Sequence, residues 1–174
     1  MFRPGIVLAS LILVTAIATN TLAAETAQSS GNPPAGGMGL KSWGLRAGLS
    51  VDPDQVVGGI QWDVGRIVPN LRLQPNLELG LGDDKITLFG SLPVHYLFHI
   101  QSAVTPYAGA GVSVGIVNRD RPASKGGDDT SVEAGLRLIG GLEWKMKSGK
   151  PFAVEMNIGI GDVADFQAKA VWSF

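Results

Sequence analysis

The feature that most constrains this chain is an alternation of apolar and polar residues that runs from Ser42 to the last residue, Phe174. The closing segment AKAVWSF shows it: Trp172 and Phe174 alternate with Val171 and Ser173. A period of two is that of a β-strand, in which successive side chains point to opposite faces. No segment has the 3.6-residue period of a long amphipathic helix. The region from residue 42 onward is therefore predicted to be all-β.

Turn sequences such as DPDQ, GDDK and MKSGK, with one longer polar loop at residues 118–130, divide this region into eight alternating segments. An even number of strands of about 9–11 residues is typical of a transmembrane β-barrel. We therefore predict an eight-stranded antiparallel up-and-down transmembrane β-barrel over residues 42–174. Pro75, Pro93 and Pro106 fall inside the segments. Because proline removes a ladder donor, bulges or shifted strand boundaries are expected there.

Alternation alone does not separate a membrane barrel from a soluble one, which turns its apolar face inward. Two further observations favour the membrane. The apolar face carries no charge within the strands, and the polar face is rich in glycine, of which the chain has 24. An eight-stranded barrel has room inside only for side chains, so charged groups there need small neighbours. On an exposed face glycine would only weaken a strand. The polar face is therefore predicted to point inward and the apolar face toward lipid.

Charged residues on the predicted inner face form a candidate lumen network. They are Arg46, Asp63, Arg72, Glu78, Glu133, Arg137, Glu143, Glu155 and Lys169. Because a buried charge is costly unless it is paired, we expect the arginines to pair with carboxylates across neighbouring strands. Such a plug of ion pairs would block free diffusion, so little or no porin-like conductance is expected.

The aromatic residues of the apolar face are sorted by strand direction. If both termini lie on one side, odd-numbered strands begin and even-numbered strands end at the same rim. Eight aromatic residues fall on that rim: Trp43, Trp62, Tyr96, Phe98, Trp144, Phe152, Trp172 and Phe174. On this face only Phe166 lies at the other rim. The pattern predicts an aromatic girdle at a membrane–water interface.

The first residues have the features of a targeting segment. Arg3 supplies a positive charge, Gly5 to Ala18 form an apolar core, and small residues follow, so we predict a cleaved signal peptide over residues 1–24. Residues 25–41 are rich in Gly, Pro, Ala and Ser and have no period, which predicts a flexible N-terminal segment.

Composition excludes several functions. The chain has no cysteine and only two histidines, so neither thiolate chemistry nor a cysteine- or histidine-rich metal site is expected. No cofactor is predicted. Its 14 basic and 15 acidic residues lack the basic excess of a nucleic-acid-binding protein.

A catalytic site has little support. Ser91 and His95 share the inner face of one predicted strand, but four residues separate them by about 13 Å at about 3.3 Å per residue. A nucleophile and its base must be within hydrogen-bond distance. His95 is instead expected near Tyr107 and Gly109 on the next strand. His99 and Ser102 fall in a turn.

The stretch TPYAGAGVSVG, followed by a loop and then GLRLIGGLEWK, is similar to the fifth and sixth strands of the small eight-stranded outer-membrane β-barrel proteins. Residues 42–174 resemble this family, which includes the barrel domain of outer membrane protein A. The resemblance implies a location in the outer membrane of a Gram-negative bacterium. It also implies that the barrel-insertion machinery reads the C-terminal strand, which ends on Phe174.

These observations predict an integral outer-membrane protein with a structural or surface-interaction role and no enzyme activity. Expected partners are outer-membrane lipid and lipopolysaccharide, the barrel-insertion machinery and an extracellular partner at loop 118–130, through Arg119, Arg121 and Lys125. One alternative is a lipid A-modifying enzyme. A second alternative is a soluble periplasmic barrel that binds a small apolar ligand.

Overall fold

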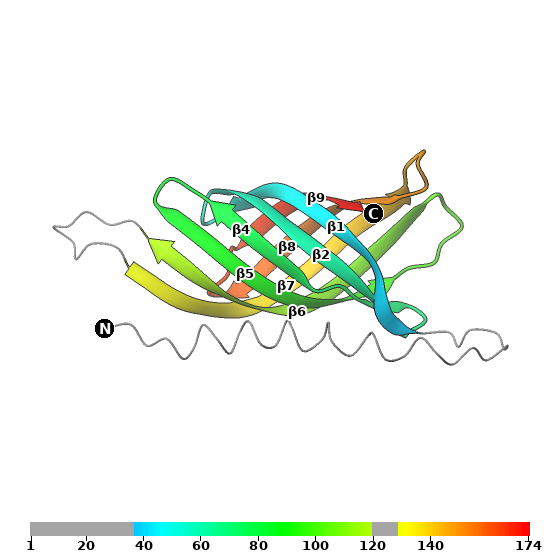
Figure 1. Cartoon of the computed structure of the whole chain (residues 1–174), viewed down its shortest axis with the longest axis horizontal. Helices are drawn as coiled ribbons and strands as arrows, with labels where there is room; N and C mark the ends of the chain where they lie inside the picture. The colour runs from blue at the N-terminus through cyan, green and yellow to red at the C-terminus, as the bar shows by residue number, and fades with distance from the viewer. Residues whose placement is uncertain (1–36, 120–128) are drawn as a thin grey trace. The chain divides into compact units, whose positions relative to one another are not determined.

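The computed structural model describes residues 37–119 and 129–174, and all of its regular structure is β (Figure 1). The strands are β1 (Met38–Val51), β2 (Gln55–Val68), β3 (Leu71–Leu73), β4 (Asn76–Leu81), β5 (Lys85–Leu97), β6 (Val104–Arg119), β7 (Asp129–Lys145), β8 (Pro151–Gly161) and β9 (Phe166–Ser173). Within the described ranges, no helix is long and apolar enough to cross a membrane. The predicted signal peptide and most of the segment 25–41 lie outside the described residues.

The strands close into a ring in which every neighbour is antiparallel. β1 pairs with β2 on one side and with β9 on the other, and from β5 to β9 each strand pairs with the next along the chain. β3 and β4 lie end to end between β2 and β5, so nine strands occupy eight positions. The prediction of an eight-stranded antiparallel up-and-down barrel is therefore confirmed.

The break between β3 and β4 falls at Pro75, where an irregularity was expected. The backbone N–H of Gln74 still donates to the carbonyl of Pro93, and the N–H of Trp62 donates to the carbonyl of Pro75. Neither proline can donate in return, so two ladder donors are missing at one place. Pro93 lies at this break on one side of β5, although the β5–β6 ladder continues past it without a register shift. The β6–β7 ladder also continues past Pro106 without a shift, so the irregularity expected at Pro106 was wrong. Pro106 lies opposite Phe98, beyond the end of β5, so its missing donor interrupts no pair of the β5–β6 ladder.

Two boundaries differ from the prediction. β1 begins at Met38 and not at residue 42, because Met38 pairs with Gly65 across an irregular register and the N–H of Arg66 donates to the carbonyl of Gly37. At the other rim, β6 and β7 pair as far as Arg119 and Asp129. The strands therefore extend into the predicted loop 118–130, whose residues 120–128 lie outside the described part of the chain.

The two faces of the wall differ in the way the alternation predicted. Large apolar residues such as Leu45, Leu79 and Leu138 are exposed on the outer face, at 43–48% of their surface. The inner face carries the buried polar residues, among them Gln61, His95 and Asn157. A soluble barrel with an apolar interior would show the reverse.

Candidate functional site

Glu78 is the centre of the charge network inside the barrel. Its Oε2 accepts a hydrogen bond from Nη1 of Arg137 at 2.7 Å, and its Oε1 accepts one from Nζ of Lys169 at 2.5 Å. Nε of Arg46 lies 2.9 Å from the same Oε1, an ion-pair distance without hydrogen-bond geometry. All four side chains are buried. One carboxylate from β4 therefore joins cations from β1, β7 and β9 across the lumen.

Glu155 on β8 completes this central cluster. It forms an ion pair with Nη2 of Arg46 and accepts a hydrogen bond from the hydroxyl of Tyr107 at 3.1 Å. The other guanidinium nitrogen of Arg46, Nη1, donates to Gln61 at 2.9 Å. Arg46 is thus held from three directions, by two carboxylates and an amide. Desolvated charges are tolerated in such an arrangement because each has a close opposite charge.

The remaining predicted network residues lie apart from the centre. Arg72 pairs with Glu143 at 2.7 Å toward the rim that carries the termini. Glu133 pairs with Arg119, a residue that the sequence assigned to the outer loop. Asp63 is not in the network: its Oδ1 accepts the backbone N–H of Gly65 at the bulge between β1 and β2. The pairing expected for Asp63 was wrong, because the bulge provides a backbone donor beside it.

Small neighbours make the room that the charged and aromatic side chains need. The ring of Tyr107 lies over Gly141, its register partner on β7, and a Cβ added to that glycine would lie 2.2 Å from the ring. His95 lies in the same way over Gly109, as the sequence predicted. His95 and Tyr107 are also in contact, with ring centroids 5.0 Å apart.

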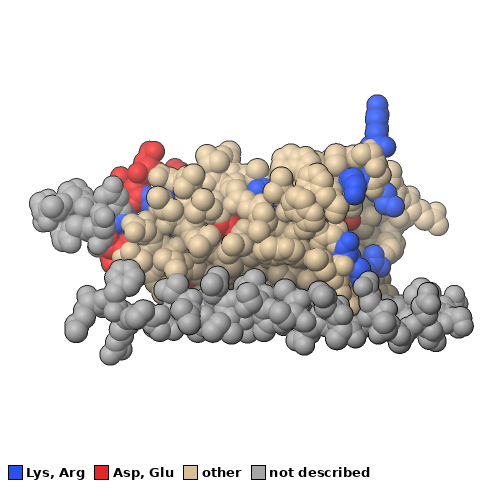
Figure 2. All heavy atoms as spheres, viewed as in Figure 1, with Lys and Arg blue, Asp and Glu red and all other residues tan. Residues whose placement is uncertain are grey.

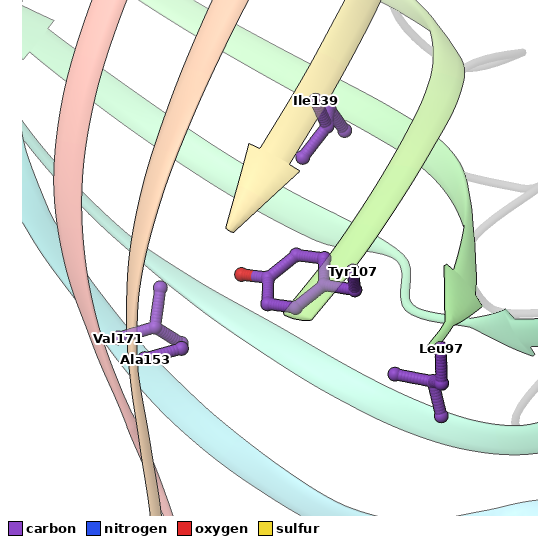
Figure 3. Packing of buried hydrophobic residues seen from close by; sticks show 5 residues of the cluster. All are labelled: Leu97, Tyr107, Ile139, Ala153 and Val171. Carbon is purple, nitrogen blue, oxygen red and sulfur yellow. The ribbon is translucent and has the colours of Figure 1, made fainter. Parts of the chain in front are cut away.

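Apolar clusters lie on both sides of the central charges. One consists of Leu97, Tyr107, Ile139, Ala153 and Val171, which come from strand segments near the terminal rim (Figure 3). In Figure 3 the Tyr107 hydroxyl points toward Ala153 and Val171 on β8 and β9. The other cluster, of Phe89, Val117 and Val163, lies toward the opposite rim. Arg137 lies over the ring of Phe89 at 5.6 Å, so this cluster contacts the charged layer directly.

The eight predicted interface aromatics all lie on the outer face, near the rim that carries the termini. Trp43 stacks on Phe174 at 4.9 Å across the closing pair of strands, β1 and β9. Phe152 contacts Trp144 at 4.9 Å and Trp172 at 5.3 Å. A further contact, of 5.0 Å, joins Tyr96 on β5 to Phe98, just beyond the end of that strand. The register places Trp62 opposite Trp43.

The groups considered for catalysis are not arranged for it. The hydroxyl of Ser91 is hydrogen-bonded to that of Ser113 at 2.7 Å. Neither ring nitrogen of His95 has a hydrogen-bond partner among the described residues. His99 and Ser102 lie in the turn between β5 and β6. The described residues also contain no group of three or more histidine and acidic side chains placed to hold a metal ion.

The two rims carry opposite charge, a separation that was not predicted from the sequence (Figure 2). The rim formed by the β1–β2, β4–β5, β6–β7 and β8–β9 connections carries aspartates: Asp52, Asp54, Asp83, Asp84, Asp129, Asp162 and Asp165. The terminal rim carries Lys41, Arg66, Lys145, Lys147 and Lys150. Because the charges of the whole chain nearly balance, this separation cannot be seen in the composition. It arises because the topology places alternate turns at the same rim.

A pocket opens at the acidic rim, and we call it the mouth pocket. Its volume is about 230 Å³. Asp52, Asp162 and Asp165 line it from two turns, and Gln167 and Arg137 line it from the barrel wall. Arg119, which the sequence offered for contact with an extracellular partner, also lines it and is already paired with Glu133. Arg121 and Lys125 lie outside the described residues.

Comparison with protein-family models gave no match, and no curated protein matched the sequence. Among solved structures, the crystal structure of neisserial surface protein A, an eight-stranded outer-membrane β-barrel, is similar, with a TM-score of 0.53. The match covers 76% of this chain and 91% of the neisserial chain, at 16% sequence identity. An identity this low shows the fold alone. The resemblance to the small eight-stranded outer-membrane barrels is confirmed at that level.

Proposed function

We propose that this chain is an integral protein of the bacterial outer membrane, with a structural or surface-interaction role and no enzyme activity. The observation that carries the proposal is the arrangement of the wall. Apolar side chains without charge cover its outside between the rims, while paired charges occupy its inside. Lipid is the solvent that suits such an exterior, since a closed barrel leaves no strand edge unpaired in hydrocarbon.

The aromatic rim supports an orientation. Rings that are partly exposed on the outer face, such as Trp43, Tyr96 and Phe174, suit the interface between lipid headgroups and water. In the proposed orientation this rim, at which β1 begins and β9 ends, faces the periplasm. The acidic rim then faces outward, beside lipopolysaccharide. A C-terminal strand that ends on Phe174 suits recognition by the barrel-insertion machinery, which an export signal at residues 1–24 would allow the chain to reach.

The charged side chains in the lumen support a barrel whose interior is filled and is not an open channel. The central ion pairs lie between two apolar clusters, and both carboxylates of the centre contact more than one partner. A wide water-filled channel needs open cross-section, which an eight-position barrel filled by such side chains does not provide. The proposed role is therefore not that of a general porin.

A charge placed on the outer face tests the proposal. Leu138 lies in the middle of β7 and is 48% exposed, whereas Asn118 is an exposed position near the acidic rim. In lipid, Leu138→Arg should destabilise the folded barrel by about 2–4 kcal/mol and Asn118→Arg by about 0–1 kcal/mol. The measurement is urea unfolding of the full chain in phospholipid vesicles.

A heat-modifiability gel on the same preparations reports whether each variant folds. An unboiled band that migrates faster than the boiled band indicates a closed barrel that resists detergent. If the chain is recovered from cells without detergent and Leu138→Arg is harmless, the outer face meets water and the membrane proposal is overturned.

A further inference from the structure

The mouth pocket has unbalanced charge. The side chains of Asp52, Asp162 and Asp165 have no ion pair among the described residues. Of the three cations that line the pocket within the described part of the chain, two are already committed, since Arg137 pairs with Glu78 and Arg119 with Glu133. Lys85 is the remaining one. Three carboxylates therefore face a single uncommitted ammonium group, which favours a positively charged ligand.

A buried acceptor in the same pocket also lacks a partner. Gln167 is only 4% exposed, and its Oε1 accepts no hydrogen bond within the described ranges. The neighbouring amide, Gln55, is satisfied at both ends: its Nε2 donates to the carbonyl of Lys85 and its Oε1 accepts from Thr87. A buried acceptor without a donor costs about 1–3 kcal/mol. A ligand that brings an N–H group to Gln167 would remove this cost.

The size of the pocket limits the ligand. A volume of about 230 Å³ corresponds to about eight water molecules at about 30 Å³ each. This is below the range of about 300–1,000 Å³ typical of sites for drug-sized molecules. Phe89 contributes an apolar surface to the lining, beside polar groups such as Thr87. The pocket therefore suits a short molecule with an apolar stem and at least one positively charged end.

We propose that the mouth pocket binds a small organic ammonium ion, held by Asp52, Asp162 and Asp165 and donating a hydrogen bond to Oε1 of Gln167. The site requires only the folded barrel. It rests on the proposed function solely for the side of the membrane from which the ligand arrives. A barrel that folds but does not bind would overturn this inference and leave the proposed function intact.

The test compares three probes with a four-carbon chain. Calorimetric titration of the full folded chain, in the uncharged detergent octyl glucoside, would use putrescine, the neutral 1,4-butanediol and the dianion succinate. Saturable one-to-one binding of putrescine, weakened by added salt, is expected, with no measurable binding of the other two. Preferential binding of succinate would assign the site to an anion held by Lys85 and the unpaired Nε of Arg137, and would overturn the proposal.

Matched charge variants distinguish binding in the pocket from general electrostatic attraction to the acidic rim. Asp162→Asn combined with Asp165→Asn removes two charges that line the pocket and should weaken putrescine binding about tenfold. Asp83→Asn combined with Asp84→Asn removes two charges of the same rim that do not line it, and should change binding less than about threefold. Equal effects of the two pairs would show diffuse attraction and overturn the proposal.

Gln167→Leu tests the hydrogen bond separately from charge. It removes the acceptor at nearly constant volume, and an about fivefold loss of putrescine affinity is expected. The heat-shifted gel band verifies that each variant is folded. An unchanged affinity in the folded Gln167→Leu variant would overturn the proposed hydrogen bond.

Discussion

At the scale of single residues, the interior depends on a small number of carboxylates. Glu78 is 2% exposed and contacts three cations, whereas Glu143 is 22% exposed and pairs, among the described residues, only with Arg72. Removing one partner of a buried pair leaves the other charge desolvated and uncompensated. A partly exposed pair loses less, because water can replace the missing partner.

Glu78→Gln should therefore destabilise the barrel by about 3–5 kcal/mol, and Glu143→Gln by about 1 kcal/mol or less. Both changes keep the shape of the side chain and remove one charge, so Glu143→Gln is the matched control. Urea unfolding in vesicles at neutral pH measures the two values. Equal losses would mean that Glu78 does not hold the central cluster together.

Two adjacent glycines of β7 provide a second prediction. A Cβ at Gly141 would collide with the ring of Tyr107, whereas one at Gly140 would point outward and meet nothing within 4 Å. Gly141→Ala should cost about 1–3 kcal/mol, since the ring must move in a packed interior. Gly140→Ala should be neutral or slightly stabilising. Unfolding titrations compare them, and a neutral Gly141→Ala would contradict the close packing of Tyr107 on β7.

At the scale of elements, the closing pair of strands is the least local part of the fold. β1 and β9 lie at opposite ends of the described barrel sequence, and eight register pairs join them. The backbone N–H of Phe174 donates to the carbonyl of Trp43 at 2.8 Å, and their rings stack. The last residue of the chain therefore takes part in closure by both its backbone and its ring.

Phe174→Ala should destabilise the barrel by about 1–2 kcal/mol, because the stacked pair and its buried area are lost. The control is Phe166→Ala, on the same strand and outer face but at the other rim, where no ring contact is present among the described residues. Folding yield in vesicles, where the insertion machinery is absent, measures the loss of barrel stability. A yield in cells that falls much further for Phe174→Ala than for Phe166→Ala would indicate an additional loss of recognition by the insertion machinery.

At the scale of the whole molecule, the lumen is layered. Central ion pairs lie between two apolar clusters. The acidic rim lies at one end of the barrel and the terminal rim, which carries lysines and an arginine, lies at the other. We expect the purified barrel to show no stable porin-sized single-channel current in planar bilayers, since side chains fill the interior of so small a barrel. A steady large current from a folded, heat-modifiable sample would contradict the closed lumen. A detergent blank is the control.

Much of this architecture is predictable from the order of the residues. An alternation with a period of two assigns every strand residue to one of two faces, because a β-strand has no other geometry. That is why the faces of residues as distant as Arg46 and Lys169 were predicted, and why the aromatic residues sorted onto one rim. The prolines were less predictable. Pro75 interrupts a strand and Pro106 does not, because the cost of a missing donor depends on whether a partner strand lies opposite.

Local periodicity and the solvent that each face suits account for the eight strand positions, the facing of the side chains and the apolar exterior. The partners of the inward side chains depend on the tertiary structure. In the folded barrel, Glu78 contacts three cations from β1, β7 and β9, and Arg119 pairs with Glu133. Asp63 accepts a hydrogen bond from a backbone N–H at a bulge. The tertiary structure also places aspartates from separate turns around the mouth pocket. The reason is that strand register and ring closure determine which inward side chains meet, and neither is encoded in the period of a single strand.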